Sequence, residues 1–185
     1  LKVGNETITS KMIFLCTGSK PMIPPIKGLE KVNYHTSDTI LKINRLPETL
    51  AIIGGGYIAV EYGHFFATMG TKVTIIEMAD RLLLSEEPEI SALLKEELSK
   101  RMDIHTSALA EEVKQGAYEV TVVTKDRKTG KGQELSAQKI LIAVGRKSNA
   151  DLVKVENTGV AVDERGFRKV NKFLETSKKN IWAVG

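Results

Sequence analysis

The chain has 185 residues, a formal net charge of +4 and 42% hydrophobic residues, which is typical of one globular domain or one domain with appendages. No apolar run approaches the roughly 18 residues of a membrane span. Scattered basic residues and only 5% aromatic residues argue against nucleic-acid binding. The single cysteine, Cys16, excludes an internal disulfide and a cysteine metal cluster, and it favours a reducing, cytoplasmic setting.

In the N-terminal quarter of the chain, the sequence predicts short elements and loops. Residues 1–15 resemble a hairpin arm followed by a buried strand. The segment 16–28 is dense in glycine and proline and predicts a loop. Residues 37–44 predict a short helix, and Pro47 marks the entry to the next strand.

The middle of the chain alternates between apolar strands and helices. Short apolar runs predict buried parallel strands at 49–55 and 71–77, and a third, short strand is predicted at 102–108. The helix between the first two strands ends at Gly70, and the next helix begins near Pro88. The apolar spacing predicts the face that each helix buries: Ile58, Glu61, Tyr62, Phe65, Phe66 and Met69 in the first, and Ile90, Leu93, Leu94 and Leu98 in the second.

The pattern changes after the third strand. Residues 109–138 alternate apolar and polar with glycine-containing turns, which predicts an antiparallel meander. A continuous apolar strand follows at 139–145, then a two-stranded piece at 159–170 and a last strand at 180–185. The predicted fold class is therefore α/β, a Rossmann-like doubly wound parallel sheet with an antiparallel β-meander.

The stretch LAIIGGGYIAVEYG, residues 50–63, places a glycine triplet between a predicted strand and a predicted helix. Gly54 and Gly56 match the first two glycines of G-x-G-x-x-G, and Ala59 takes the third place, where alanine is accepted. Gly54 permits the tight turn, and Gly56 lets the backbone approach a pyrophosphate at the helix N-terminus. The loop therefore predicts a dinucleotide site.

The acid at the end of the second strand indicates which dinucleotide binds. Glu77 lies 23 positions after Gly54, close to the spacing of about 20 that a ribose-binding carboxylate has. Its charge repels a 2′-phosphate, by about 4 kcal/mol for charges ~4 Å apart at an effective dielectric of ~20. NAD(H) is therefore favoured over NADP(H). Arg81 is the counter-argument, because it could receive a 2′-phosphate; otherwise it is a solvated loop charge or a partner of Asp80.

Glu61 falls on the predicted apolar stripe of the first helix. One interpretation is that its carboxylate satisfies backbone N–H groups or a neighbouring cation near the positive end of the helix. The other is that it faces a cofactor cleft and needs a cationic partner, because an unpaired buried charge is expensive. The nearby sequence names no such partner.

At this point the chain resembles the flavoprotein disulfide reductases, the class I pyridine nucleotide-disulfide oxidoreductases. The likeness is to their central NAD-binding domain, and most of all to the dihydrolipoamide dehydrogenase branch. Cys16 stands where the family has alanine, and Ser148 where it has proline. The resemblance rests on these segments, read along the chain: IFLCTGSKPMIPPIKG, IIGGGYIAVEYG, VTIIEMADRLL, ILIAVGRKSN and TSKKNIWAVG.

The resemblance also implies a division of the chain. Residues 1–19 and 147–185 match stubs of an FAD domain, and 20–146, with its core at 48–146, matches the NAD(H)-binding domain. The family's FAD fingerprint, redox-active cysteine pair and dimerisation domain have no match. We therefore expect a fragment that binds NAD(H) and is inactive alone, with no catalytic residue of its own. FAD, the missing FAD and dimerisation domains and a homodimeric assembly belong to the parent.

Family roles carry over to matching positions as expectations. Gly54, Gly56 and Ala59 line the pyrophosphate turn, with Ile58 beside them, and Glu77 holds the adenosine ribose. Tyr57 covers the nicotinamide pocket or simply packs on a loop. Glu61 pairs with a lysine of the FAD domain, and the backbone of Gly145 passes beside the nicotinamide. Cys16 is expected to be a buried small residue.

Two alternatives stay open. The same domain plan serves mercuric, glutathione and coenzyme A-disulfide reductases and NADH oxidases, and GYIAVE also resembles the NADPH-using glutathione reductase branch. The other alternative is a stand-alone, non-catalytic dinucleotide-sensing module, which would explain the missing catalytic centre without truncation. In either case we expect no nucleic-acid or membrane partner.

Overall fold

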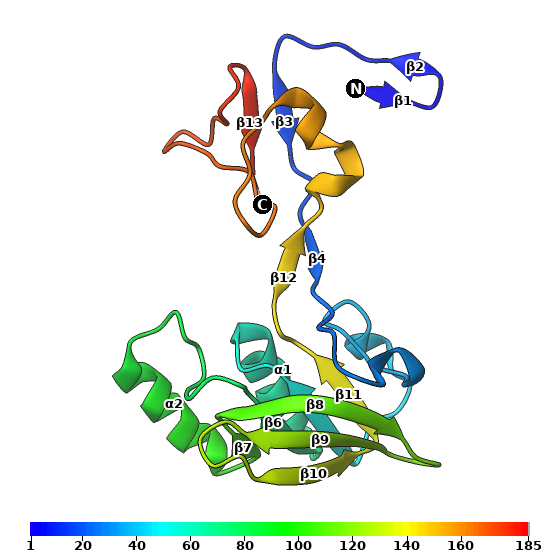
Figure 1. Ribbon diagram of the computed structural model, residues 1–185, viewed down its shortest axis with the longest axis vertical. Helices are drawn as coiled ribbons and strands as arrows, with labels where there is room; N and C mark the ends of the chain where they lie inside the picture. Colours follow the sequence, from blue (N-terminus) through cyan, green and yellow to red (C-terminus); the bar gives the residue numbers. More distant parts are fainter. Residues whose placement is uncertain (185) are drawn as a thin grey trace. The chain divides into compact units, whose positions relative to one another are not determined.

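The computed structural model describes residues 1–184, which form two compact units. We call Pro21–Gly145 the sheet unit. Leu1–Lys20 and the segment that begins at Arg146 together form the other, which we call the terminal unit (Figure 1). The chain therefore leaves the terminal unit once, builds the sheet unit and returns. That the terminal unit derives from an FAD domain stays a prediction.

A four-stranded parallel sheet is the centre of the sheet unit. Its strands run in the order β11-β5-β6-β7. The sequence predicted all four strands, three of them as apolar runs and β7 as a short strand, and the α/β class with a Rossmann-like parallel sheet is confirmed. The bounds are β5 (Thr49–Ile53), β6 (Lys72–Ile76), β7 (Asp103–His105) and β11 (Lys139–Ile142), with helices α1 (Tyr57–Thr68) and α2 (Pro88–Ser99) in the connections.

An antiparallel meander forms the second sheet. It consists of β8 (Ala108–Gln115), β9 (Val120–Asp126) and β10 (Gly132–Ala137), paired in sequence order as predicted (Figure 1). A register shift between Ala110 and Glu112 marks a bulge in β8. The meander packs on one face of the parallel sheet, since its inward residues share a core cluster with alternate residues of β5.

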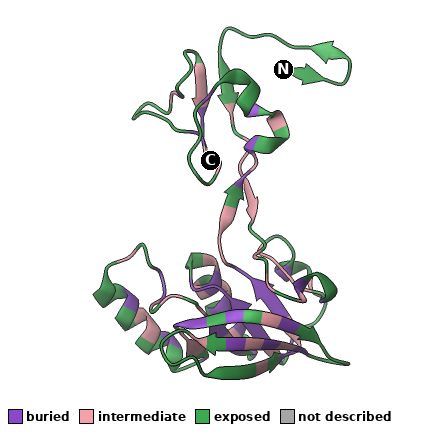
Figure 2. Cartoon of the chain, viewed as in Figure 1, coloured by how far each residue is buried: buried purple, intermediate pink, exposed green. Residues whose placement is uncertain are grey.

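Alternation along β5 divides the core into two layers. Ala51 and Ile53 pack with the meander, whereas Leu50 and Ile52 pack with Phe66 of α1 and neighbouring residues. Successive side chains of a strand point to opposite faces, so a strand buried on both sides must be apolar throughout. This explains the continuous apolar runs that the sequence shows. Figure 2 shows the parallel sheet buried.

The buried face of α1 differs from the predicted one. Ala59, Gly63 and Phe66 are buried, whereas Phe65 and Met69 are 45% and 57% exposed and Glu61 is exposed. A Cβ at Gly63 would lie 3.3 Å from Ile75 Cδ1, so the small residues let the helix sit close to the sheet. Of the predicted stripe, Ile58, Tyr62 and Phe66 do pack in the core on this side of the sheet. The apolar spacing gave small residues no weight, and for this reason the prediction missed Ala59 and Gly63.

The prediction for α2 was likewise right only in part, since Leu94 and Leu98 pack in the core as predicted. Ile90 and Leu93 are 51% and 57% exposed, while Ser91 and Leu98 are buried. The Ser91 hydroxyl donates to the carbonyl of Leu83 at 3.3 Å, which satisfies its buried polar group. Over the residues that the structure describes, no helix is long and apolar enough to cross a membrane.

The terminal unit consists of short elements. Its strands are β1 (Lys2–Val3), β2 (Glu6–Thr7), β3 (Ile13–Leu15), β4 (Ser19–Pro21), whose last residue belongs to the sheet unit, β12 (Arg146–Ser148) and β13 (Ile181–Ala183). They form two-stranded sheets, β1-β2, β12-β4 and β13-β3. The 3-10 helices η3 (Ala150–Val153) and η4 (Val155–Thr158) follow β12. The predicted pair within 159–170 is reduced to a single bridge, Val162 to Arg168.

Two expectations about this unit were wrong. β3 was predicted to be buried, but Ile13 and Phe14 are 39% and 62% exposed. Cys16, expected to be a buried small residue, is also exposed. The physical reason is the same in both cases: a two-stranded sheet of three residues has little that covers it. The predicted helix at 37–44, in the sheet unit, is only the 3-10 turn η2 (Ile40–Lys42), and η1 (Leu29–Lys31) precedes it.

Candidate dinucleotide site

The turn after β5 requires glycine at its first position. Gly54 has φ +118°, and a Cβ built there would lie 2.6 Å from the Ala143 carbonyl carbon. Its amide donates to the Ile76 carbonyl at 2.9 Å. The turn is therefore held tightly between the ends of β6 and β11. A side chain at this position is excluded both by conformation and by space.

The second glycine of the triplet was not singled out by the motif, yet it positions Glu77. A Cβ at Gly55 would lie 2.7 Å from Glu77 Cγ and 2.8 Å from Glu77 Oε2. The carboxylate of Glu77 thus lies directly against the glycine turn. The Gly55 carbonyl also accepts a hydrogen bond from the Leu83 amide at 2.9 Å, which fixes the loop after β6 beside the turn.

The third glycine faces open space. Gly56 has φ −82°, which any residue adopts, and a Cβ built there would meet nothing within 4 Å. Neither backbone conformation nor packing within the described chain explains a glycine here. A glycine here is explained if a ligand approaches the backbone at the start of α1, as the pyrophosphate of a dinucleotide does.

The N-terminus of α1 has unpaired donors. Gly56 is the N-cap, and without a side chain it supplies no capping hydrogen bond. The first helical hydrogen bond runs from Val60 to the Gly56 carbonyl at 3.1 Å. The amides of Tyr57, Ile58 and Ala59 therefore have no acceptor within the helix. Such amides, together with the helix dipole, favour an anionic group in the open space.

Glu77 is half-buried and held by its own loop. Its Oε1 accepts the Ala79 amide at 2.6 Å, while no hydrogen bond to Oε2 occurs within residues 1–184. Arg81, the counter-argument in the sequence, donates from Nη2 to the Leu84 carbonyl at 3.1 Å. It forms no ion pair with Glu77 or Asp80 in the part of the chain that is described. The carboxylate therefore keeps one oxygen for hydroxyl donors.

The other predicted residues lie around the same edge of the sheet. Tyr57 is 52% exposed, and its hydroxyl contacts the Ser85 hydroxyl at 3.2 Å and the Glu86 carboxylate. Ile58 is half-buried against the helix-side core, and Ala59 is fully buried. The sequence did not indicate Ser85 or Glu86 as partners of Tyr57. A contact between the start of α1 and a loop 28 residues later leaves no local sequence pattern.

Gly145 and Glu61 complete the predicted set. Gly145 has φ +137°, follows β11 and accepts the Met22 amide at 2.9 Å. Since β11 pairs with β5, Gly145 and Gly54 end neighbouring parallel strands. Glu61 is exposed one turn into α1 and makes no ion pair among the described residues. The structure thus brings the glycine turn and Glu77 into contact, whereas no hydrogen bond or ion pair within residues 1–184 joins Glu61 to them.

Comparison with known proteins identifies the family. The family described as pyridine nucleotide-disulphide oxidoreductase matches residues 1–185. The chain belongs to this family. The predicted family resemblance is therefore confirmed. No group of three or more histidine, cysteine, aspartate or glutamate side chains that could hold a metal occurs within residues 1–184.

Several relatives have known activities. A mercuric reductase from Staphylococcus aureus is 34% identical over all of this chain and 34% of its own length. A dihydrolipoyl dehydrogenase from Bacillus subtilis is 36% identical over 97% of this chain and 38% of its own length. The chain therefore spans little more than a third of the length of these relatives.

A solved structure supports the fold. The HOCl-induced flavoprotein disulfide reductase RclA from Escherichia coli is 36% identical, with a TM-score of 0.82 over 94% of this chain and 39% of that chain. Together these relatives make the chain part of an oxidoreductase family whose description names a pyridine nucleotide. Its particular role within such an enzyme remains a proposal.

Proposed function

We propose that the sheet unit binds NAD(H), as the nucleotide domain of an FAD-dependent oxidoreductase of the dihydrolipoamide dehydrogenase type. The observation that carries the proposal is the Glu77 carboxylate against the Gly55 turn, with Oε1 held by the Ala79 amide. Its Oε2 can accept hydrogen bonds from ribose hydroxyls. The amides of Tyr57, Ile58 and Ala59 and the open space at Gly56 are suited to the pyrophosphate.

The charge of Glu77 favours NAD(H) over NADP(H). A 2′-phosphate ~4 Å from the carboxylate would cost about 4 kcal/mol at an effective dielectric of ~20. That corresponds to about a thousandfold in affinity. Arg81 supports the same preference, because its guanidinium is directed to the Leu84 carbonyl of its own loop.

Within the parent enzyme, the role of this chain is to bind and orient. NAD supplies a hydride acceptor when bound. Glu77 and the α1 amides would hold its adenosine and pyrophosphate, Tyr57 and Gly145 would border the nicotinamide, and the exposed Glu61 would pair with a cation of the FAD domain. The chain's one cysteine cannot form the redox disulfide of a disulfide reductase. We therefore expect the chain alone to bind NADH without oxidising a dithiol substrate, and the parent to be a cytoplasmic homodimer.

Side-by-side titration of NADH and NADPH tests this proposal. The wild-type chain should bind NADH at least a hundredfold more tightly than NADPH. Glu77→Gln keeps an oxygen for the Ala79 amide but loses the charge, so it should reduce this preference at least tenfold. Glu89→Gln, an exposed acid in the first turn of α2, is the control and should change neither affinity. A wild-type chain that binds NADPH more tightly would sink the NAD assignment.

Two alternatives give different outcomes. Tighter NADPH binding would favour a mercuric or glutathione reductase-like role, which the Staphylococcus aureus relative also suggests. If the parent is a coenzyme A-disulfide reductase or an NADH oxidase, the chain should still prefer NADH, and only the substrate of the parent differs. For a stand-alone dinucleotide-sensing module we expect an encoding gene that ends close to this chain, whereas a parent gene nearly three times as long supports the enzyme.

A further inference from the structure

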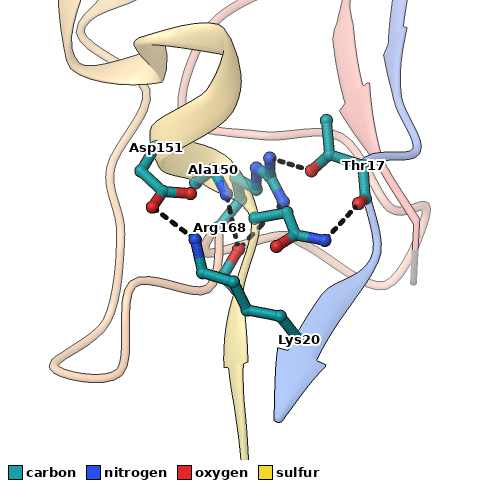
Figure 3. Close-up of polar contacts among 7 residues, drawn as sticks. Thr17, Lys20, Ala150, Asp151 and Arg168 are labelled. Atoms are coloured by element: carbon teal, nitrogen blue, oxygen red, sulfur yellow. Dashed lines mark hydrogen bonds and ion pairs between the residues drawn. The ribbon is translucent and has the colours of Figure 1, made fainter. Parts of the chain in front are cut away.

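A buried arginine in the terminal unit has no anionic partner among the described residues. Arg168 is only 9% exposed, and a guanidinium stays charged at every physiological pH. Its terminal nitrogens donate to two hydroxyls, Nη1 to Ser148 Oγ at 3.2 Å and Nη2 to Thr17 Oγ1 at 2.5 Å. Its Nε is buried without any acceptor among residues 1–184. Figure 3 shows Arg168 with Thr17.

Asp151, an acid of the same unit, is already engaged. Asp151 Oδ2 forms an ion pair with Lys20 Nζ at 2.6 Å (Figure 3), and this contact chiefly holds the pKa of Asp151 below its ordinary value. Lys147 also acts on Asp151 through its charge. Asp151 is therefore already paired, and no ion pair between it and Arg168 occurs among the described residues. Burying a charge without a counter-charge is expensive, so an anion bound at Arg168 would neutralise its uncompensated charge.

The two hydroxyls add hydrogen-bond donors. Ser148 Oγ accepts both from Arg168 and from the Ala150 amide at 3.1 Å, so its two lone pairs are in use. Thr17 Oγ1 likewise accepts from Arg168. The hydroxyl hydrogens of Ser148 and Thr17 have no acceptor among the described residues. Each terminal nitrogen of Arg168 also keeps a second hydrogen.

We propose that Arg168, Thr17 and Ser148 bind a phosphate group. Hydroxyls and a guanidinium are the donors that phosphate oxygens accept from in proteins. A phosphate offers oxygens to the guanidinium and to both hydroxyls at once, whereas a carboxylate has only two oxygens, so the donor set favours phosphate. All of these residues belong to the terminal unit, so the site does not depend on the proposed NAD(H) function.

Thermal unfolding of the 185-residue chain tests the site, with phosphate compared with chloride at equal ionic strength. Phosphate should raise the unfolding temperature by about 3–5 °C for each tenfold excess over its Kd. Acetate at the same ionic strength is the control for a site that binds a carboxylate instead of a phosphate. The phosphate could come from a phosphate ester or from the free ion, and glycerol phosphate distinguishes the two. If glycerol phosphate binds more tightly than inorganic phosphate, the site is for a phosphate ester; if it binds more weakly, the site is for the free ion. No phosphate response, or an equal response to acetate, would overturn the proposal.

Variants locate the response. Arg168→Met should abolish it, and Thr17→Val should weaken phosphate binding about tenfold or more while keeping the guanidinium. Arg165→Met removes an exposed arginine three positions away and should leave the response unchanged. If Arg168→Met fails to fold, Thr17→Val and Arg168→Lys decide, since both should fold and bind phosphate more weakly. A full phosphate response in either would contradict the assignment.

Discussion

The sheet unit and the terminal unit bury their apolar residues to different degrees. Each face of the parallel sheet has its own cluster of buried residues, whereas the terminal unit has one small cluster formed by Ala150, Val155 and Val160. Several of its large apolar side chains stay in solvent: Phe14 is 62% exposed and Phe173 is 71% exposed. Figure 2 shows this contrast in colour.

The contrast shows that the number of paired strands determines how many apolar side chains a sheet can bury. Four paired strands with layers on both faces bury a continuous set of side chains. Two-stranded sheets of two or three residues cannot do so. We expect the free energy of unfolding of the chain to lie mainly in the sheet unit. The first prediction below tests this comparison, and the other two test contacts within the sheet unit.

The largest effect should come from truncating a ring in the sheet unit. Phe66 is 2% exposed, so Phe66→Ala leaves a cavity and should lower the free energy of unfolding by about 3–5 kcal/mol. The matched variant Phe14→Ala removes a mostly exposed ring that stacks on Trp182 at 5.2 Å and should cost less than about 1.5 kcal/mol. Urea unfolding followed by circular dichroism measures both. Equal losses would remove the distinction between the units.

Two glycines of one turn should separate stability from binding. Gly54→Ala places a side chain at φ +118° against the Ala143 carbonyl and should cost about 2–4 kcal/mol. Gly56→Ala enters open space at an ordinary φ and should cost less than about 1 kcal/mol. It should nonetheless weaken NADH binding, because the methyl group takes up ligand space. Thermal unfolding and NADH titration of both variants check this, and a stable Gly54→Ala would contradict the packing argument.

The smallest effect concerns pH. His35 pairs through its backbone with β11, and burial, followed by the charge of Lys139, lowers its pKa from 6.5. The folded state therefore disfavours the protonated form. Stability is fully present above pH 6.5 and should fall as the pH drops through 6.5 toward the lower pKa of the folded state. His35→Leu should flatten this slope relative to wild type, and His64→Gln, an exposed histidine, should not. Urea midpoints across this pH range measure it.

Local patterns predicted the elements well but not the contacts between them. Continuous apolar runs identified the strands of the parallel sheet, and alternation identified the meander, because both follow from which faces are buried. The predicted face of α1 was right only in part: it missed Ala59 and Gly63, because they are small and allow the helix to approach the sheet closely. The motif count passed over Gly55, whose role appears only once Glu77 lies against it.

The sequence by itself determined the order of strands and helices, the glycine turn before α1, the acid after β6 and, through its motifs, the family. These are encoded within a few residues, where backbone conformation and hydrophobic spacing act. Only the tertiary structure decided which residues meet: Gly55 with Glu77, Tyr57 with Ser85, and Arg168 with Thr17 across 151 positions. The physical reason is that such contacts depend on how the whole chain packs, and no local period records them.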